Sequence, residues 1–351
     1  MPASLYRRHD PAGRAKYQDV KEHARSQARV LAGTPGVLKS RTIAGRQYWM
    51  REYIRVDGKK VDEYLGAAGA VAPGRVTELR SAIELARTLA AGSAQLRLFG
   101  YQRIERKPAA VLAVLFNRGL VRAGLTLVGS HAFGALLNEL GIIGAGYKTQ
   151  DVDVARGAPL SFALPEGATL ASLLGETGLG FVPVPRLRRH EASTSYKLPG
   201  AQALAVDLLA PGRSAGEIVP VPELAAHAQA IPFLDFLVDE PIDSVVLSPN
   251  QVIPVRIPAP ERFAVHKLFS SQSRRSDRDK IRKDLEQAAL LACAIEEETP
   301  ERLGEAYKAL PAAAKAAVRR GALAAARLLE SSHAEGREAL VRIAGRRRLA
   351  R

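Results

Sequence analysis

The stretch that decides the fold is LTLVGSHAFGALLNELG at residues 125–141, which a loop separates from DVDVA at residues 151–155. Its first four residues are apolar and predict a short buried strand. After Gly129 and Ser130, apolar side chains recur at helical spacing and predict a helix that ends at Gly141. The stretch therefore predicts a strand that runs through a tight turn into a helix.

The turn at Gly129 and Ser130 is a candidate phosphate site. A helix that opens straight after a strand directs free backbone N–H groups and the positive end of its dipole at one point. Gly129 allows an anion to approach the backbone closely, and Ser130 offers a hydroxyl both to the phosphate and to the helix start. A plain serine cap without a ligand explains the same pattern, so the turn needs support from elsewhere in the chain.

Two aspartates follow in DVDV. Because side chains alternate along a strand, Asp151 and Asp153 are expected on one face, with Val152 and Val154 toward the core. Adjacent carboxylates repel each other, and a hard divalent cation such as Mg²⁺ or Mn²⁺ offsets that cost. The spacing is also common in ordinary surface strands.

A third carboxylate, Asp207, lies in QALAVDLLAP at residues 202–211, a predicted strand with apolar neighbours. A buried carboxylate needs a partner. Beside DVDV in the sheet, Asp207 would complete a three-carboxylate metal cage, or would orient an acceptor hydroxyl as its base. The competing interpretation is a solvent-facing aspartate at a strand end in another layer.

This order of elements resembles the DNA polymerase β-type nucleotidyltransferase superfamily, over roughly residues 108–290. It is most similar to stand-alone bacterial nucleotidyltransferase-like proteins, including abortive-infection toxin enzymes. In those proteins the carboxylates are followed by a lysine on a helix and then by an Arg-x-Lys-Asp helix. Here PERFAVHKLF supplies Lys267, and RDKIRKDLEQ supplies Lys283 and Asp284.

The resemblance implies that Ser130 holds a triphosphate, that Asp151 and Asp153 hold metal, that Lys267 pairs with phosphate, and that Asp284 lies near the nucleotide. Three features depart from the family pattern. The segment between Ser130 and Asp151 is long, His-Ala-Phe follows Gly-Ser, and Glu286-Gln287 replaces a further aspartate. The loop GIIGAGYKTQ accounts for the extra length and would be a lid over the nucleotide or a longer excursion.

We therefore expect an α+β protein with a small mixed-sheet nucleotidyltransferase core flanked by helices. The predicted parts are an N-terminal basic helix and β-hairpin at 1–70, a helical linker at 71–107, the core at 108–260 and a C-terminal helical bundle at 261–351. Within these parts, helices are expected at 11–34, 76–91 and 108–121, and strands at 243–247 and 251–256. Helix stops are expected near Pro300, Pro311 and Gly321.

The predicted hairpin turns at Asp57-Gly58 and carries basic and aromatic side chains. Such surfaces stack bases and neutralise phosphates, so four of its residues are candidate nucleic-acid contacts: Arg46, Trp49, Arg51 and Arg55. Packing of the hairpin on a neighbouring part of the chain is the alternative. For Lys280, Lys283 and Asp284, which share one helical face, the alternative is a surface charge lattice.

The chain has 351 residues and a net charge of +15, with the basic excess in the flanks and an acidic section at 151–260. This distribution favours an enzyme that holds cations centrally and a polyanion around them. An arginine- and alanine-rich composition alone would give the same excess.

The cysteine and hydropathy patterns exclude several classes of protein. Cys293 is the only cysteine, which excludes an internal disulfide and a cysteine zinc cluster. His131 and His266 are expected to pack or cap rather than bind metal, since neither has a ligand partner at suitable spacing. Neither a membrane span nor a secretory signal is expected, and the predicted location is cytoplasmic.

The predicted activity is transfer of a nucleoside monophosphate from an NTP to an acceptor hydroxyl, with release of pyrophosphate. The basic flanks favour RNA as acceptor, for example the end of a tRNA, while a protein side chain and a small hydroxylated molecule stay open. A toxin-like enzyme would have an inhibitory protein partner. The alternatives are a non-catalytic nucleic-acid-binding protein with a nucleotidyltransferase-like core, and a phosphate-binding regulatory module.

Overall fold

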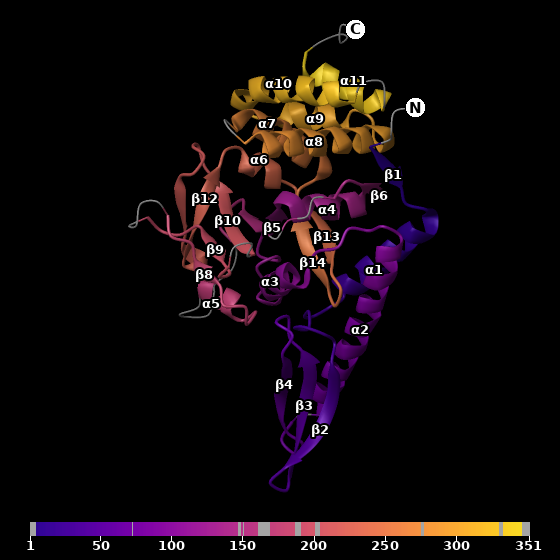
Figure 1. Cartoon of the computed structure of the whole chain (residues 1–351), viewed down its shortest axis with the longest axis vertical. Coiled ribbons are helices and arrows are strands. Elements are labelled where there is room, and N and C mark those ends of the chain that lie inside the picture. The colour runs from indigo at the N-terminus through magenta and orange to yellow at the C-terminus, as the bar shows by residue number, and fades with distance from the viewer. Residues whose placement is uncertain are drawn as a thin grey trace.

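The computed structural model describes residues 5–71, 73–146, 149, 151–160, 169–186, 191–200, 204–274, 277–329 and 333–345. A central sheet with its helices lies between a layer of C-terminal helices and a projecting three-stranded sheet (Figure 1). This mixture of helices and strands is consistent with the predicted α+β class. Among the described helices, none combines the length and apolarity needed to cross a lipid bilayer.

The central sheet is mixed, with strand order β11-β12-β10-β7-β5; β9 pairs with β10, and β8 pairs with β9. β10 runs parallel to β7 and β12, and β5 runs antiparallel to β7. The bounds are β5 (Leu125–Val128), β7 (Val152–Arg156), β8 (Val182–Pro183), β9 (Ser195–Lys197), β10 (Ala205–Pro211), β11 (Ile218–Val221) and β12 (Ala226–Ile231).

The predicted strand, turn and helix at 125–141 correspond to β5 and α4 (Gly129–Glu139). All four residues of β5 are buried, and the apolar face of α4 packs against β5 and β7. Each large apolar side chain buried in this way contributes about 1.5–3 kcal/mol relative to exposure. α4 begins at Gly129, with Val128 as its N-cap and no side-chain cap. The expectation that the Ser130 hydroxyl caps this helix is therefore wrong.

Alternation along β7 and β10 separates core residues from acidic ones. Val152 and Val154 are buried as predicted, and Asp153 between them is partly exposed. Val206 and Leu208 are likewise buried on either side of Asp207. Because the two strands are parallel neighbours, their acidic side chains leave the sheet on the same face.

The C-terminal helices form a bundle beside the central sheet (Figure 1). The predicted stop near Gly321 is wrong, because this glycine lies inside a helix, α10. A Cβ at position 321 would overlap the backbone of Leu268, so glycine here permits a close crossing of two helices. The bundle consists of α7 (Pro260–Ser273), α8 (Arg278–Glu298), α9 (Arg302–Ala309), α10 (Ala312–Leu328) and α11 (Ala334–Ile343).

The start of the chain packs on the central part. β1 (Tyr6–Arg8) pairs with β6 (Ile142–Gly144), and α1 (Pro11–Arg25) packs on α2 (Pro73–Leu98). α1 is shorter than the predicted helix at 11–34, and α2 is longer than the predicted 76–91. The other elements are α3 (Arg106–Asn117), α5 (Leu170–Gly175), η1 (Pro222–Leu224), α6 (Leu234–Val238) and the antiparallel pair β13 (Ile242–Leu247) and β14 (Val252–Ile257).

Beside α2, three antiparallel strands project from the body (Figure 1). They are β2 (Val37–Ile43), β3 (Arg46–Ile54) and β4 (Lys60–Ala67), and we call them the arm. β3 and β4 are joined through Asp57 and Gly58, as the sequence predicted for the hairpin. β2 was not predicted, because its side chains are almost all exposed and show no alternation.

Candidate active site

The candidate site lies where β5 passes into α4 and faces the middle of the sheet. Asp153 of β7 is opposite Val128, the last residue of β5, in the antiparallel pair. In the parallel pair on its other side, Asp153 is in register with Asp207 of β10. Strand pairing therefore brings the two carboxylates together beside the start of α4.

Gly129 lies directly against Asp153. Its φ is +67°, and a Cβ on this residue would overlap the Asp153 carboxylate. Only glycine meets both conditions, because it tolerates a positive φ and occupies no space beyond its backbone. The turn thus allows the carboxylate to lie against the first residue of α4.

Burial and neighbouring charges raise the pKa of Asp153 to about 6. Loss of hydration is the largest cause, followed by repulsion from Asp207 and Asp151, while Lys267 and Lys283 act in the opposite direction. The pKa of Asp207 is also raised, first by burial and then by Asp151, against a hydrogen bond from Ser195. Both carboxylates are therefore held under electrostatic repulsion.

A divalent cation fits this donor set. In the part of the chain that the structure describes, no lysine or arginine forms an ion pair with Asp151, Asp153 or Asp207, so their mutual repulsion is offset only at a distance. Hard carboxylate oxygens are the ligands that Mg²⁺ and Mn²⁺ prefer. However, no three acidic, histidine or cysteine side chains of the described residues are grouped as a metal site. Asp153 and Asp207 lie in register on neighbouring strands, and Asp151 is exposed ahead of β7. The three-carboxylate metal site stays a prediction.

Lys283 of α8 connects the C-terminal bundle to the start of α4. Its Nζ donates a hydrogen bond of 2.7 Å to Ser130 Oγ. Burial and the nearby Lys267 lower the pKa of Lys283. A lysine that loses hydration in this way gains more from an anionic ligand than an exposed lysine does.

Asp284 orients two further cations. Lys267 Nζ donates to Asp284 Oδ1 at 2.7 Å, and Arg274 Nε donates to Oδ2 at 3.0 Å. The Asp284 side chain is only 2% exposed. Both of its oxygens therefore accept hydrogen bonds from cations. The position of Asp284 near the nucleotide stays a prediction.

The histidines of the site are neutral. Burial, with Lys283 as the second cause, lowers the pKa of His131 to about 4. Burial and Lys267 likewise lower that of His266 to about 4. His266 Nε2 lies 3.3 Å from the carbonyl oxygen of Pro232. Both residues are buried, and neither lies in a metal-binding group of the described residues.

Lys283→Met is expected to raise the KM for NTP by about tenfold to a hundredfold, the range for a lost hydrogen bond to a charged group. The reason is that the variant keeps the apolar stem and loses the charge beside Ser130. Initial rates at varied NTP concentration measure this. Lys280→Met is the matched control, because Lys280 is exposed on the same helix and paired with Asp277, and it should change KM by less than about twofold. Equal KM values for the two variants would remove Lys283 from the site.

Asp284→Ala is expected to lower the free energy of unfolding by about 3 kcal/mol, because it leaves two cations without their shared buried partner. Denaturant unfolding measures this loss. Asp279→Ala, an exposed acid of the same helix, should change stability by about 0.5 kcal/mol or less. If the two variants unfold at the same denaturant concentration, the buried charge cluster does not stabilise the fold.

The four predicted nucleic-acid contacts of the arm differ in their surroundings. Arg51 is buried, and its guanidinium donates to Glu63 and to the carbonyl oxygens of residues 32, 34 and 35. The prediction for Arg51 is therefore wrong: the charge holds the arm to the preceding segment. Arg55 pairs with Asp57, and its guanidinium lies against Gly178. Arg46 is exposed and Trp49 half-buried, so their role stays a prediction.

One contributor to the site was not identified from the sequence. Ser195 lies on β9, opposite Asp207, in a strand of three residues. Strand pairing alone connects Ser195 to the site, and no local pattern reveals it.

The mixed sheet presents paired carboxylates beside the start of a helix, and a second helical layer adds lysines. This arrangement is typical of an enzyme that acts on a phosphate-bearing substrate. The family model described as "Nucleotidyltransferase" matches residues 106–311, more than half of the chain. The chain therefore belongs to this nucleotidyltransferase family and is a transferase. No match was found among the curated proteins or the solved structures.

Proposed function

We propose that the protein is a metal-dependent nucleotidyltransferase that moves an NMP from an NTP to an acceptor hydroxyl. The observation that carries the proposal is the register of β7 and β10, which pairs Asp153 with Asp207 beside Gly129. The resemblance to the DNA polymerase β-type superfamily supports the same chemistry. A nucleotidyl donor is expected for any member of the family.

Each side chain of the site has a proposed role. Asp153 and Asp207, with Asp151 completing the set, hold Mg²⁺ or Mn²⁺. When bound, the cation offsets the charge of the triphosphate and of the pyrophosphate leaving group and makes the acceptor hydroxyl more acidic. Ser130 and the N–H groups at the start of α4 bind a terminal phosphate, and Lys283 moves from the Ser130 hydroxyl to that phosphate.

The proposed reaction joins the acceptor oxygen to the α-phosphorus and breaks the bond between the α- and β-phosphates. Pyrophosphate leaves, and the proton of the acceptor hydroxyl passes to Asp207, whose pKa is raised toward that of a base. Lys267, held by Asp284 on the second helical layer, pairs with the departing phosphates. The chain thus supplies charge complementarity on both sides of the bond that breaks.

RNA is the proposed acceptor, with the end of a tRNA as one example. Support comes from the net charge of +15 and its concentration in the flanks of the acidic core. The toxin resemblance adds the proposal that a protein partner inhibits the enzyme. A cytoplasmic location is proposed with it, since NTP and RNA are found there.

The proposal is tested by incubating the protein with each α-labelled NTP, Mg²⁺ and total cellular RNA, beside Asp153→Ala. Label that enters RNA with the wild type and is absent with the variant supports it. Tight RNA binding without label transfer, equal in both proteins, overturns it in favour of a non-catalytic nucleic-acid-binding protein. Parallel reactions with protein and small hydroxylated acceptors identify the acceptor class.

A further inference from the structure

A small pocket of about 40 Å³ lies beside the first turn of α4. Its walls come from α4, from β13 and from residues 102–104 of the segment between α2 and α3. At about 10–15 Å³ for each water molecule, this space holds about three waters. The pocket therefore suits a group of the size of one phosphate and is too small for a nucleobase.

The pocket carries positive charge without an opposing carboxylate. Arg103 is the only charged side chain among the described residues that line it, and it forms no ion pair in the part of the chain that the structure describes. Burial lowers the pKa of Arg103, and the neighbouring Arg97 and Arg106 add to this effect. Glu105 acts in the opposite direction. A half-buried arginine beside two other cations is stabilised when an anion binds to it.

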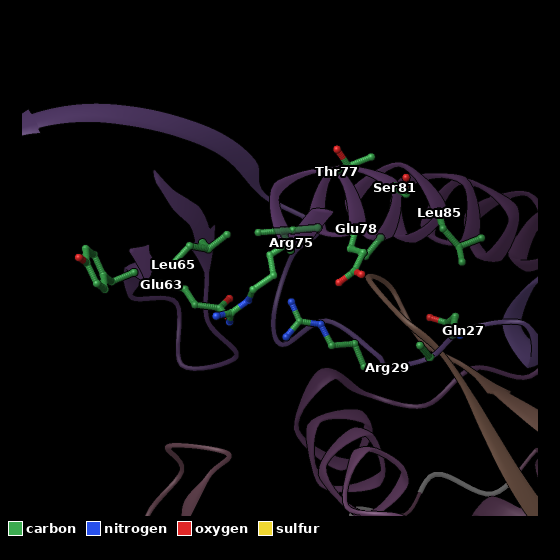
Figure 2. Close-up of a pocket in the computed structure, with 13 residues that line it drawn as sticks. Gln27, Arg29, Glu63, Leu65, Arg75, Thr77, Glu78, Ser81 and Leu85 are labelled. Carbon is green, nitrogen blue, oxygen red and sulfur yellow. The ribbon is translucent and has the colours of Figure 1, made fainter. Parts of the chain in front are cut away.

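A larger cleft of the protein differs in this respect. It measures about 660 Å³ and lies between the arm and α2, where Arg29 and Arg75 share the lining with Glu63 and Glu78 (Figure 2). Because two basic and two acidic side chains line it, its charges balance. The pocket beside α4 is thus distinguished by an arginine that no carboxylate of the lining offsets.

Backbone contacts hold Arg103 beside the pocket. The residue before it, Gln102, donates from its N–H to Asn138 Oδ1 at 2.8 Å and accepts from Asn138 Nδ2 at 3.0 Å. The residue after it, Ile104, donates from its N–H to the carbonyl oxygen of Leu247 at 2.9 Å. The backbone of Arg103 is therefore fixed between α4 and β13 before a ligand binds, which lowers the entropic cost of binding.

The first turn of α4 offers further donors to the same space. α4 has no side-chain cap, so the N–H groups of its first turn have no side-chain acceptor there. His131 lines the pocket and is only 7% exposed, and its Nε2 has no hydrogen-bond partner among the described groups. A buried nitrogen without a partner costs free energy, and a phosphate oxygen in the pocket would satisfy it. Ser130, which accepts from Lys283, also lines the pocket.

We propose that this pocket binds the terminal phosphate of the NTP, with Arg103 as a further substrate-binding residue. The guanidinium of Arg103 donates to two oxygens of that phosphate, and Ser130 and the start of α4 bind it as well. A phosphate of the acceptor strand has the same chemistry. The NTP is favoured because Ser130 belongs both to the pocket and to the turn that lies against Asp153. The inference rests on the proposed function in naming the NTP as the source of this phosphate.

The test is isothermal titration calorimetry with inorganic tripolyphosphate, without metal and without an acceptor. Arg103→Met is expected to weaken binding by about tenfold to a hundredfold, the range for a lost hydrogen bond to a charged group. Arg103→Lys keeps the charge but loses the planar pair of donors, so it should recover only part of this loss. Thermal melting of each variant establishes that it is folded.

A matched variant separates this contact from general charge. Arg80→Met removes an exposed arginine of α2 that does not line the pocket, and it should change the affinity by less than about threefold because salt screens distant charges. In the transfer reaction, Arg103→Met should raise the KM for NTP and leave the KM for RNA unchanged. A general loss of structure would instead change both KM values.

A wild type that does not bind tripolyphosphate, or equal affinities for Arg103→Met, Arg80→Met and the wild type, would overturn the inference. Unchanged tripolyphosphate affinity with a raised KM for RNA would also overturn it, in favour of a phosphate of the acceptor strand. Asp153→Ala, measured without metal, should bind tripolyphosphate at least as tightly as the wild type, because it removes a negative charge. Failure of label transfer with Arg103-dependent binding intact therefore counts against the proposed chemistry alone.

Discussion

Asp153→Asn is expected to abolish nucleotidyl transfer and, above pH 6, to make the protein more stable. Activity is lost because the amide removes one charge from the paired carboxylates. We expect a fall of at least about a hundredfold, because substitutions of the residues that only orient metal ligands already cost about tenfold to a hundredfold. Stability rises because folding raises the pKa of Asp153 from 3.8 to about 6, so the charged carboxylate destabilises the folded wild type above pH 6. The neutral amide of the variant removes this cost.

The sign of this pH dependence follows from the raised pKa. Below pH 3.8 the carboxyl is protonated in both states and has no effect on stability. As the pH rises toward 6, the folded state alone retains the proton, so stability falls across this window and stays low above it. The difference between variant and wild type is at most about 3 kcal/mol. Melting temperatures of both proteins at several pH values measure it, without added metal. A variant that is less stable above pH 6, or that retains transfer, contradicts the account.

Gly129→Ala is expected to lower both stability and activity strongly. The positive φ alone costs a residue with a Cβ about 1–2 kcal/mol. The new methyl group also overlaps the Asp153 carboxylate and must displace it, so transfer should fall by about a hundredfold, the cost of a small misplacement of a reacting group. Denaturant unfolding and initial rates measure the two effects.

Gly45→Ala separates the cost of the positive φ from the cost of the overlap with Asp153. Gly45 has a φ of +75°, and a Cβ there has open space around it. This variant should therefore lose only the stability that the positive φ costs, and it should retain its activity. If Gly129→Ala is no more harmful than Gly45→Ala, the contact between Gly129 and Asp153 does not shape the site.

Local patterns were sufficient for the centre of the fold. The apolar run of β5 and the helical spacing after it predicted β5 and α4, because one buried face dictates each. The alternation in β7 predicted that Val152 and Val154 are buried. β2 and the true lengths of α1 and α2 could not be predicted, because exposed strands lack alternation and helix ends depend on packing with distant segments.

The residues of the site could be predicted where a motif within one element identifies them. Asp153 and Gly129 could be identified from adjacent motifs, but their contact depends on the pairing of β5 with β7. Arg51 was misjudged because it is a charged residue in a basic segment, and only tertiary contacts show that it binds backbone carbonyls. The contacts of Asp284 with Lys267 and Arg274 likewise depend on tertiary structure and could not be predicted.

The most direct test of the account is Mn²⁺ binding, measured by electron paramagnetic resonance in the presence of a non-hydrolysable NTP analogue. The account predicts a bound ion in the wild type, with an affinity at least about tenfold lower in Asp153→Asn and in Asp207→Asn. Asp235→Asn, which removes an exposed acid elsewhere, should bind like the wild type. Equal Mn²⁺ affinity in all four proteins would contradict the assignment of the metal and nucleotide site to β7 and β10.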